Sequence, residues 1–218
     1  MSRTAAVVCE GATDFPILEA IILELWPEID RVLPLQPPLD ELGQPKSPRG
    51  GWSEVQKWCE AHAGTLTELL SDDFGDPIDL LVVALDVDIA IQARIMNPPR
   101  QGLTPYAAKR LCNAVKGWLA AGAQRLPIEL VIGLPAMAVE AWIIAALFRD
   151  CKNPEQLADP ARYLAEHGKL EMKDGRPWKR ISQHRSFAGR VTGSLDKVRM
   201  RCPEAERLCH KIERRRHG

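Results

Sequence analysis

The stretch AAVVCEGATD, residues 5–14, decides the fold of this chain. An apolar run typical of a buried strand ends in Glu10, and an apolar helix pattern follows Asp14. The stretch LLVVALDVD, residues 80–88, repeats the theme and ends in two further acids. In an open α/β sheet, ligands bind in the crevice outside the carboxyl ends of the strands. Two such strands therefore predict an acidic cleft, and carboxylate oxygens are the ligands that Mg²⁺ and Mn²⁺ prefer.

Strand and helix patterns alternate over the first 150 residues. Strands are predicted at 4–10, 31–35, 79–86 and 128–133. Helices are predicted at 15–26, 53–70, 105–121 and 137–148. Alternation of this kind favours a parallel sheet with helices on both faces. We therefore expect an α/β fold with a Rossmann-like sheet of about four parallel strands over residues 1–150. Residues 151–218 lack strand patterns, and a basic, mainly helical extension packed on that domain is expected.

The net charge of zero conceals an asymmetry between these two regions. Residues 1–150 hold 12 Lys and Arg against 20 Asp and Glu, a net charge of −8. Residues 151–218 hold 17 against 9, a net charge of +8. An acidic half beside a basic half suits a metal-dependent enzyme that acts on a polyanion. Solvated Lys and Arg on terminal helices would explain the basic half equally well.

Cysteine usage and hydropathy point to a cytoplasmic protein. The six cysteines are scattered and form no CxxC pair, which favours free thiols over a zinc site or a disulfide framework. No apolar run reaches the roughly 18 residues of a membrane helix. The first residues lead directly into a strand pattern without the plan of a signal peptide.

Five acids are candidates for a common site. Glu10 and Asp14 flank a strand-to-helix turn, in which glycine at position 11 lets the backbone bend. Asp86 and Asp88 are two residues apart, so on an extended strand they would share one face. Glu140 is the single charge in the apolar stretch AMAVEAWII, residues 136–144, and such a charge is rarely buried without a partner.

Each of these acids also has a plainer interpretation. Asp14 could serve only as a helix N-cap, and Glu10 could be solvated at the end of its strand. Asp86 and Asp88 could be turn residues where a strand stops. Glu140 could lie on the exposed face of an amphipathic helix. The metal-site hypothesis is favoured because acids follow three successive predicted strands.

The pattern EGxTD at residues 10–14, followed by DxD at residues 86–88, resembles the Toprim domain of topoisomerases, primases and OLD-type nucleases. The later element PAMAVEAW, residues 135–142, is similar to a group of small bacterial Toprim proteins related to the OLD nucleases. The resemblance covers roughly residues 4–150. It implies a Toprim-like catalytic domain over residues 1–150.

The resemblance also implies a divalent-metal site that uses Mg²⁺ or Mn²⁺ to hydrolyse phosphodiester bonds of nucleic acid. It makes Glu10 a metal ligand or general acid/base, and Asp86 and Asp88 metal ligands. Asp14 and Glu140 occupy the places at which OLD-type members hold a second metal. The implied function is a two-metal nuclease, with a role in phage defence.

Basic residues of the extension complete this hypothesis. OLD-type nucleases use a downstream lysine, for which Lys179 is the candidate and Lys169 and Lys173 are rivals. Trp178 and His184 are candidates for stacking on a base, although Trp178 would equally suit a core. Candidate phosphate contacts are Arg176, Lys179, Arg180, Arg185 and Arg190.

Two other functions stay open at this point. A non-catalytic partner or regulatory subunit could keep the Toprim fold, and a phosphohydrolase could act on a small nucleotide. The chain has no Walker A pattern, so the ATPase of full OLD proteins would be a separate subunit. The expected partners are therefore DNA or RNA and such an ATPase subunit, without a membrane.

Overall fold

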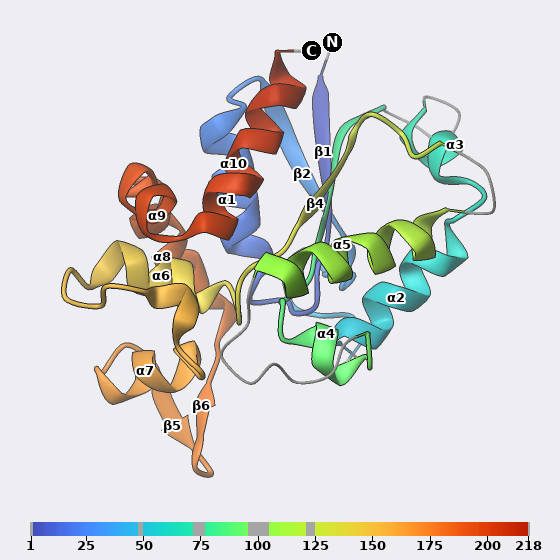
Figure 1. Ribbon diagram of the computed structural model, residues 1–218. Helices are drawn as coiled ribbons and strands as arrows, with labels where there is room; N and C mark the ends of the chain where they lie inside the picture. The colour runs from blue at the N-terminus through green and yellow to red at the C-terminus, as the bar shows by residue number, and fades with distance from the viewer. Residues whose placement is uncertain (1, 48–49, 72–76, 96–104, 121–124, 218) are drawn as a thin grey trace.

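The computed structural model describes residues 2–47, 50–71, 77–95, 105–120 and 125–217. Its centre is a parallel sheet flanked by helices, as the alternating pattern predicts (Figure 1). The strands run in the order β2-β1-β3-β4. Their bounds are Arg3–Val8 for β1, Ile29–Gln36 for β2, Ile78–Ala84 for β3 and Leu130–Gly133 for β4.

The strand order places a topological switch point between β1 and β3. From β1 the chain passes to β2 on one side and then returns to β3 on the other side. At the carboxyl end of β1, Val8 pairs with Gln36 of β2 and with Val83 of β3. Open α/β sheets bind ligands in the crevice outside the carboxyl ends of the strands at such a switch point. A ligand site is therefore expected at the residues that follow β1 and β3.

One face of the sheet packs against helices from both ends of the chain. Alternate residues of β1 and β3, among them Val7 and Val82, join these helices in one continuous core. The helices are α1 (Phe15–Leu25), α6 (Glu140–Leu147), α7 (Pro160–Glu166), α8 (Ile181–Thr192), α9 (Leu195–Arg201) and α10 (Pro203–Arg216).

The opposite face is covered by helices from the middle of the chain. The intervening strand residues, among them Val8 and Val83, pack against these helices in a second core. The helices are α2 (Trp52–Ala61), α3 (Leu66–Leu70), α4 (Ile89–Gln92) and α5 (Pro105–Leu119). Burial of both faces explains why the central strands β1 and β3 are almost continuously apolar rather than alternating.

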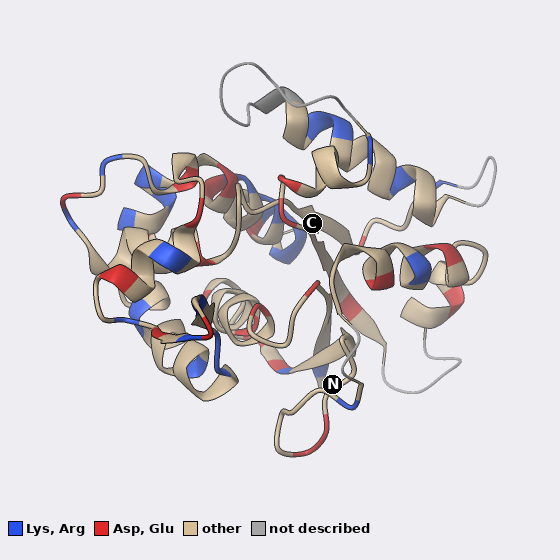
Figure 2. Ribbon diagram, turned by 90° about the horizontal axis from the view of Figure 1, so that it is seen from below, with Lys and Arg blue, Asp and Glu red and all other residues tan. Residues whose placement is uncertain are grey.

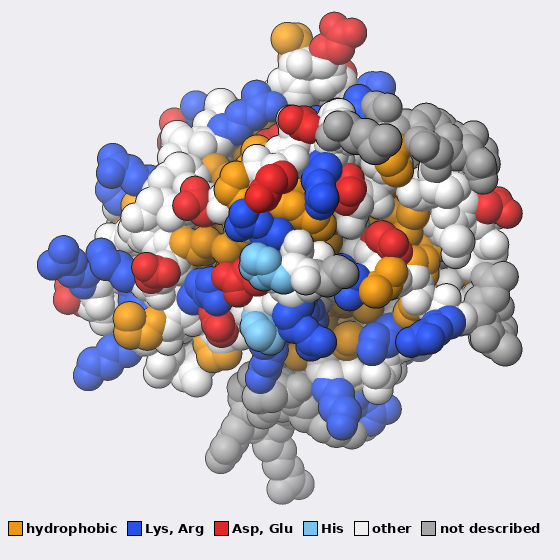
Figure 3. Space-filling model, turned by 90° about the horizontal axis from the view of Figure 1, so that it is seen from above, with side chains coloured by type: hydrophobic (Ala, Val, Ile, Leu, Met, Phe, Trp, Pro, Cys, Tyr) orange, Lys and Arg blue, Asp and Glu red, His pale blue; other side chains and the backbone are white. Residues whose placement is uncertain are grey.

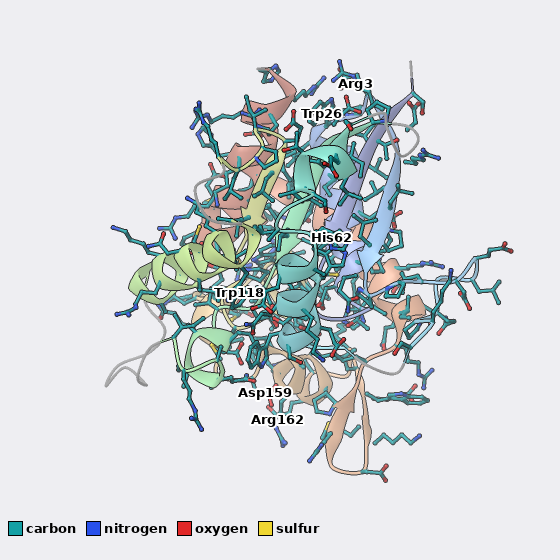
Figure 4. All side chains as sticks on the ribbon, turned by 90° about the vertical axis from the view of Figure 1, so that its right-hand side faces the viewer. Arg3, Trp26, His62, Trp118, Asp159 and Arg162 are labelled. Atoms are coloured by element: carbon teal, nitrogen blue, oxygen red, sulfur yellow. The ribbon has the colours of Figure 1, made fainter. Side chains whose placement is uncertain are left out.

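Both ends of the chain contact the segment that joins α1 to β2. Arg216, at the end of α10, forms an ion pair with Glu28, with Nη2 and Oε1 2.7 Å apart, and also donates to the Leu25 carbonyl. The guanidinium of Arg3 lies 5.5 Å from the ring centroid of Trp26, both labelled in Figure 4. The last helix is therefore tied to the connection between α1 and β2.

The C-terminal region contains a β-hairpin that the sequence pattern did not predict. The strands β5 (Glu171–Lys173) and β6 (Arg176–Trp178) are antiparallel. The turn between them is Asp174-Gly175, with φ values of +52° and +74°. Asp-Gly is a strong signal for a tight hairpin turn. The charged residues in the flanking strands gave no apolar alternation by which to recognise them. The expectation that residues 151–218 lack strands is therefore wrong.

Several predicted boundaries also need correction. The helix predicted at 53–70 is interrupted between Ala61 and Leu66, where Gly64 lies. The strand predicted to reach residue 86 ends at Ala84, and a short helix, α4, follows. The helix predicted at 105–121 ends at Leu119, and residue 121 lies outside the described residues. Within the described residues, no helix is long and apolar enough to cross a membrane.

Candidate active site

Glu10 and Asp86 meet at the switch point of the sheet. Each lies two residues beyond the last residue of its strand, and Glu10 Oε1 accepts a hydrogen bond of 2.8 Å from the Asp86 backbone N–H. The N–H of Gly51, just before α2, donates to the Glu10 carbonyl at 2.9 Å. Seen from below in Figure 2, acidic positions lie near the centre of the ribbon, where strands end. The structure thus brings together the first acids of the two quoted stretches.

Asp14 closes the turn that follows Glu10. Its Oδ2 accepts a hydrogen bond of 2.9 Å from the Gly11 N–H, and the side chain is buried. A Cβ at position 11 would lie 3.2 Å from that oxygen, so glycine lets the carboxylate approach the backbone. Asp14 occupies the N-cap position of α1, but its side chain makes no capping hydrogen bond. Its role as a side-chain cap is therefore not observed.

Asp86 and Asp88 do not share a strand face, because β3 ends before both of them. Asp88 stands at the N-cap position of α4, where Gln92 donates to its Oδ2 at 3.0 Å. Both carboxylates are partly buried. They still contribute charge to one cluster, since Asp88 raises the pKa of Glu10.

Glu140 is fully buried and has two cationic or polar partners. Its Oε1 lies 2.6 Å from Lys179 Nζ and 3.2 Å from His184 Nε2. Its Oε2 is buried without a hydrogen-bond partner. The interpretation of Glu140 as an exposed residue of an amphipathic helix is wrong, since α6 is buried over most of its length.

His184 orients Glu140 from inside the core. The side chain is 0% exposed, and its Nδ1 lies 3.0 Å from the Arg180 carbonyl oxygen. A carbonyl oxygen only accepts, so Nδ1 is the donor in this contact. Its Nε2 lies 3.2 Å from Glu140 Oε1, so the ring fixes the position of that carboxylate. The prediction that His184 stacks on a base is wrong, because the ring is enclosed.

Burial, with repulsion from neighbouring acids, raises the pKa values of Glu10, Asp14 and Asp86. Burial is the main cause for Glu10, whose pKa rises to about 8, with repulsion from Asp14 and Asp88. Burial and then repulsion from Glu140 raise the pKa of Asp14 to about 6. The pKa of Asp86 is raised by burial and by Asp14 and Glu10. A bound cation would lower these pKa values, because it would offset the repulsion among the crowded carboxylates.

Lys179 is the cation that all five acids share. Although burial opposes its charge, the pKa of Lys179 is raised because Glu140, Asp14 and Asp86 attract the ammonium. Burial raises the pKa values of Glu10 and Asp88, and the charge of Lys179 opposes that rise. Lys179 and His184 also help to hold the pKa of Glu140 down at about 2, although burial alone would raise it. The side chain of Lys179 stays 37% exposed, so solvent reaches the site from this side.

The donor set fits a hard divalent cation. Carboxylate oxygens suit Mg²⁺ or Mn²⁺, and the unpartnered Oε2 of Glu140 offers a buried acceptor. Glu10, Asp14, Asp86 and Asp88 supply the remaining oxygens. Within the described ranges, however, no three acid, histidine or cysteine side chains already stand at metal-holding distances. Binding would therefore require these side chains to turn toward a common point.

The candidate phosphate contacts are spread along β6 and α8. Arg176 is exposed on β6, and Arg180 precedes α8 and pairs with Glu171. Arg185 and Arg190 are exposed on α8. Arg190 lies ten residues after Arg180, or roughly 15 Å along a helix. Arg176 and Arg180 are thus closest in sequence to Lys179, and Arg190 is the most remote.

Trp178 is partly exposed beside these residues. The guanidinium of Arg180 lies 3.9 Å and the ammonium of Lys173 4.9 Å from its ring centroid. Of the rival lysines, Lys173 therefore contacts the hairpin tryptophan, and Lys169 is exposed before β5. The sequence offered no signal for choosing among the three lysines, nor for the role of His184. Both depend on how β6 and α8 meet α6.

Comparison with protein-family models, with curated proteins and with solved structures finds no match to this chain. The geometry of the site therefore carries the functional argument.

The pKa shifts predict how stability depends on pH. The pKa of Glu10 rises from 4.5 to about 8 on folding, so between these values the folded protein binds more protons than the unfolded chain. The free energy of unfolding should therefore fall as pH rises through this window. Glu140 acts in the opposite sense, because its lowered pKa adds stability above about 4.5 that is lost toward pH 2.

Thermal unfolding of the metal-free protein across this pH range measures the effect. Glu10→Gln should flatten the decline between pH 4.5 and about 8, on the order of a few kcal/mol at the upper end. The exposed Glu41 offers a matched Glu→Gln control that should leave the decline unchanged. Equal declines in both variants would show that Glu10 is not the group with the raised pKa.

Proposed function

We propose that this chain is a Toprim-like, Mg²⁺- or Mn²⁺-dependent nuclease that hydrolyses phosphodiester bonds of nucleic acid. The observation that carries the proposal is the meeting of Glu10 and Asp86 at the switch point, with Lys179 held beside them by Glu140. Several carboxylates with raised pKa values and one shared lysine are a combination typical of functional sites. Structural ion pairs alone do not need five acids around one cation.

The residues of the chain have separable roles in this proposal. Divalent cations held by the acids would polarise the phosphoryl group and stabilise the leaving oxygen. Lys179 is 37% exposed and would donate to a phosphate oxygen of the substrate. Glu140 and His184 hold that ammonium in place from within the core. Glu10, once ionised, can accept a proton from the attacking water.

One observation favours the non-catalytic alternative, a Toprim-fold partner or regulatory subunit. Among the residues that the structure describes, the acids do not yet form a ready metal group. A regulatory subunit could retain these acids without needing their oxygens to converge on a metal ion. Cleavage of nucleic acid separates the two functions.

The test of the proposed function is cleavage of labelled DNA and RNA, single- and double-stranded, by the purified protein. We expect cleavage of at least one substrate with Mg²⁺ or Mn²⁺ and none with a chelator. No cleavage of any substrate with either metal would count against the nuclease and favour the regulatory subunit. Hydrolysis restricted to free nucleotides would instead favour the small-nucleotide phosphohydrolase.

A further inference from the structure

A second, basic pocket lies at the outer edge of the sheet. It has a volume of about 500 Å³ and lies between strand β4, helix α5 and the end of helix α10. Leu130 and Ile132 belong to its apolar floor. Among the described residues, no acid lines it. The cationic side chains that line it are Lys116, Arg125, Lys211, Arg214 and Arg215.

This pocket is separate from the acidic cluster. Its lining includes Arg125, Leu126, Pro127 and Ile128, which precede β4, whereas the acids follow the carboxyl ends of the neighbouring strands. Figure 3, which views the side that holds both chain ends, shows Lys and Arg side chains gathered below the His side chains. The charge of the pocket is therefore not a counter-charge to the acids of the candidate active site.

Structural roles account for only part of this charge. Other arginines of the same region, Arg199 and Arg216, form ion pairs with glutamates. Within the described residues, the four pocket cations other than Lys211 form no ion pair. Lys211 donates to the Ile132 carbonyl at 2.6 Å and so caps the open edge of β4.

Helix dipoles explain three of the five positions. Lys116, Arg214 and Arg215 lie in the last turns of α5 and α10, where cations complement the dipole. Arg125 lies outside any helix, and Lys211 lies before the last turn of α10. Burial lowers the pKa of Lys211, and the neighbouring Lys116 lowers it further. Like charges are thus held together around one concave surface.

We propose that this pocket binds the phosphate backbone of a nucleic acid strand. Lys and Arg side chains neutralise phosphates, and the guanidinium groups can bind them with two parallel hydrogen bonds. The cations come from two helices and a loop, so they suit several phosphates better than one. No aromatic side chain among the described residues lines the pocket, which favours contact with the backbone over stacking on a base.

Fluorescence anisotropy with a labelled oligonucleotide tests this site. Binding is measured in chelator, so that no cleavage occurs, and across a range of salt concentrations. The variant Lys116→Gln/Arg125→Gln removes two pocket charges and leaves Lys211 at the β4 edge. The matched control, Arg149→Gln/Lys197→Gln, removes two exposed charges elsewhere.

We expect the pocket variant to bind more weakly, by roughly fivefold to tenfold per lost phosphate contact near 0.1 M salt. Its log–log salt slope should be shallower by roughly 0.7–0.9 per contact. Affinity and slope equal to the control would overturn the proposal. Weaker binding of free ATP by the pocket variant, with oligonucleotide binding equal to that of the control, would overturn it in favour of a small anion. Because cleavage is not measured, the result is independent of the nuclease proposal.

Discussion

Replacement of Asp86 by asparagine is expected to abolish Mg²⁺-dependent hydrolysis while the fold is kept. Loss of an outer partner of a metal ligand already costs about 10–100-fold, so loss of a direct ligand should cost about 1,000-fold or more. The Asp86 backbone N–H would still donate to Glu10, because this hydrogen bond does not involve the side chain. Initial cleavage rates at saturating metal measure the effect.

Stability distinguishes this result from simple misfolding. Burial and neighbouring acids raise the pKa of Asp86, so the ionised carboxylate is unfavourable in the metal-free protein. A neutral asparagine should therefore leave the unfolding temperature unchanged or raise it near neutral pH. Asp196→Asn on α9 is the matched control, since Asp196 is exposed and lies at the start of another helix. Full activity of Asp86→Asn would remove the basis of the proposed metal site.

Lys179→Gln is expected to have the second largest effect. Lys179 is the cation that acts on every acid of the cluster, and glutamine keeps hydrogen-bonding capacity without the charge. Loss of one preorganised charge at a reacting phosphate costs roughly 10²–10³-fold in kcat. The pKa of Glu140, now about 2, should rise because its ion pair is gone.

Two readouts separate a catalytic lysine from a structural one. A catalytic role predicts that kcat falls more than KM rises, and Lys179→Arg should restore part of the rate. Lys173→Gln is the matched control, because Lys173 lies on the hairpin that immediately precedes Lys179 and contacts Trp178 instead of an acid. If both lysine variants lose the same activity, the hairpin as a whole matters and the specific role of Lys179 is wrong.

The sheet, and the meeting of Glu10 and Asp86 at its edge, follow from local sequence. Apolar runs of strand length ending in Glu10 and Asp86 predict parallel strands, because both faces of the sheet are buried. The carboxyl ends of neighbouring parallel strands necessarily lie at one edge. The structure accordingly places Glu10 within hydrogen-bond distance of the Asp86 backbone.

The contacts of Glu140 with Lys179 and His184 depend on tertiary packing, which local sequence patterns do not encode. Glu140 lies on a helix whose other residues are all apolar, so their periodicity did not predict which way its side chain points. Its partners Lys179 and His184 are 39 and 44 residues further along the chain. Their approach requires the Asp174-Gly175 hairpin and the packing of α8 on α6. Sequence spacing alone could name Lys179 as a candidate but could not exclude its rivals.

Calorimetric titration with Mn²⁺ measures binding at the proposed metal site itself. In the wild-type protein we expect binding that releases protons, because Glu10, with a pKa of about 8, is largely protonated at neutral pH before metal binds. Titrations in buffers of different ionisation enthalpy measure that release. Asp86→Asn should lose most of the binding, and Asp196→Asn should bind as the wild type does. No binding to the wild type, or equal binding to Asp86→Asn, would contradict a metal site at the carboxyl ends of β1 and β3.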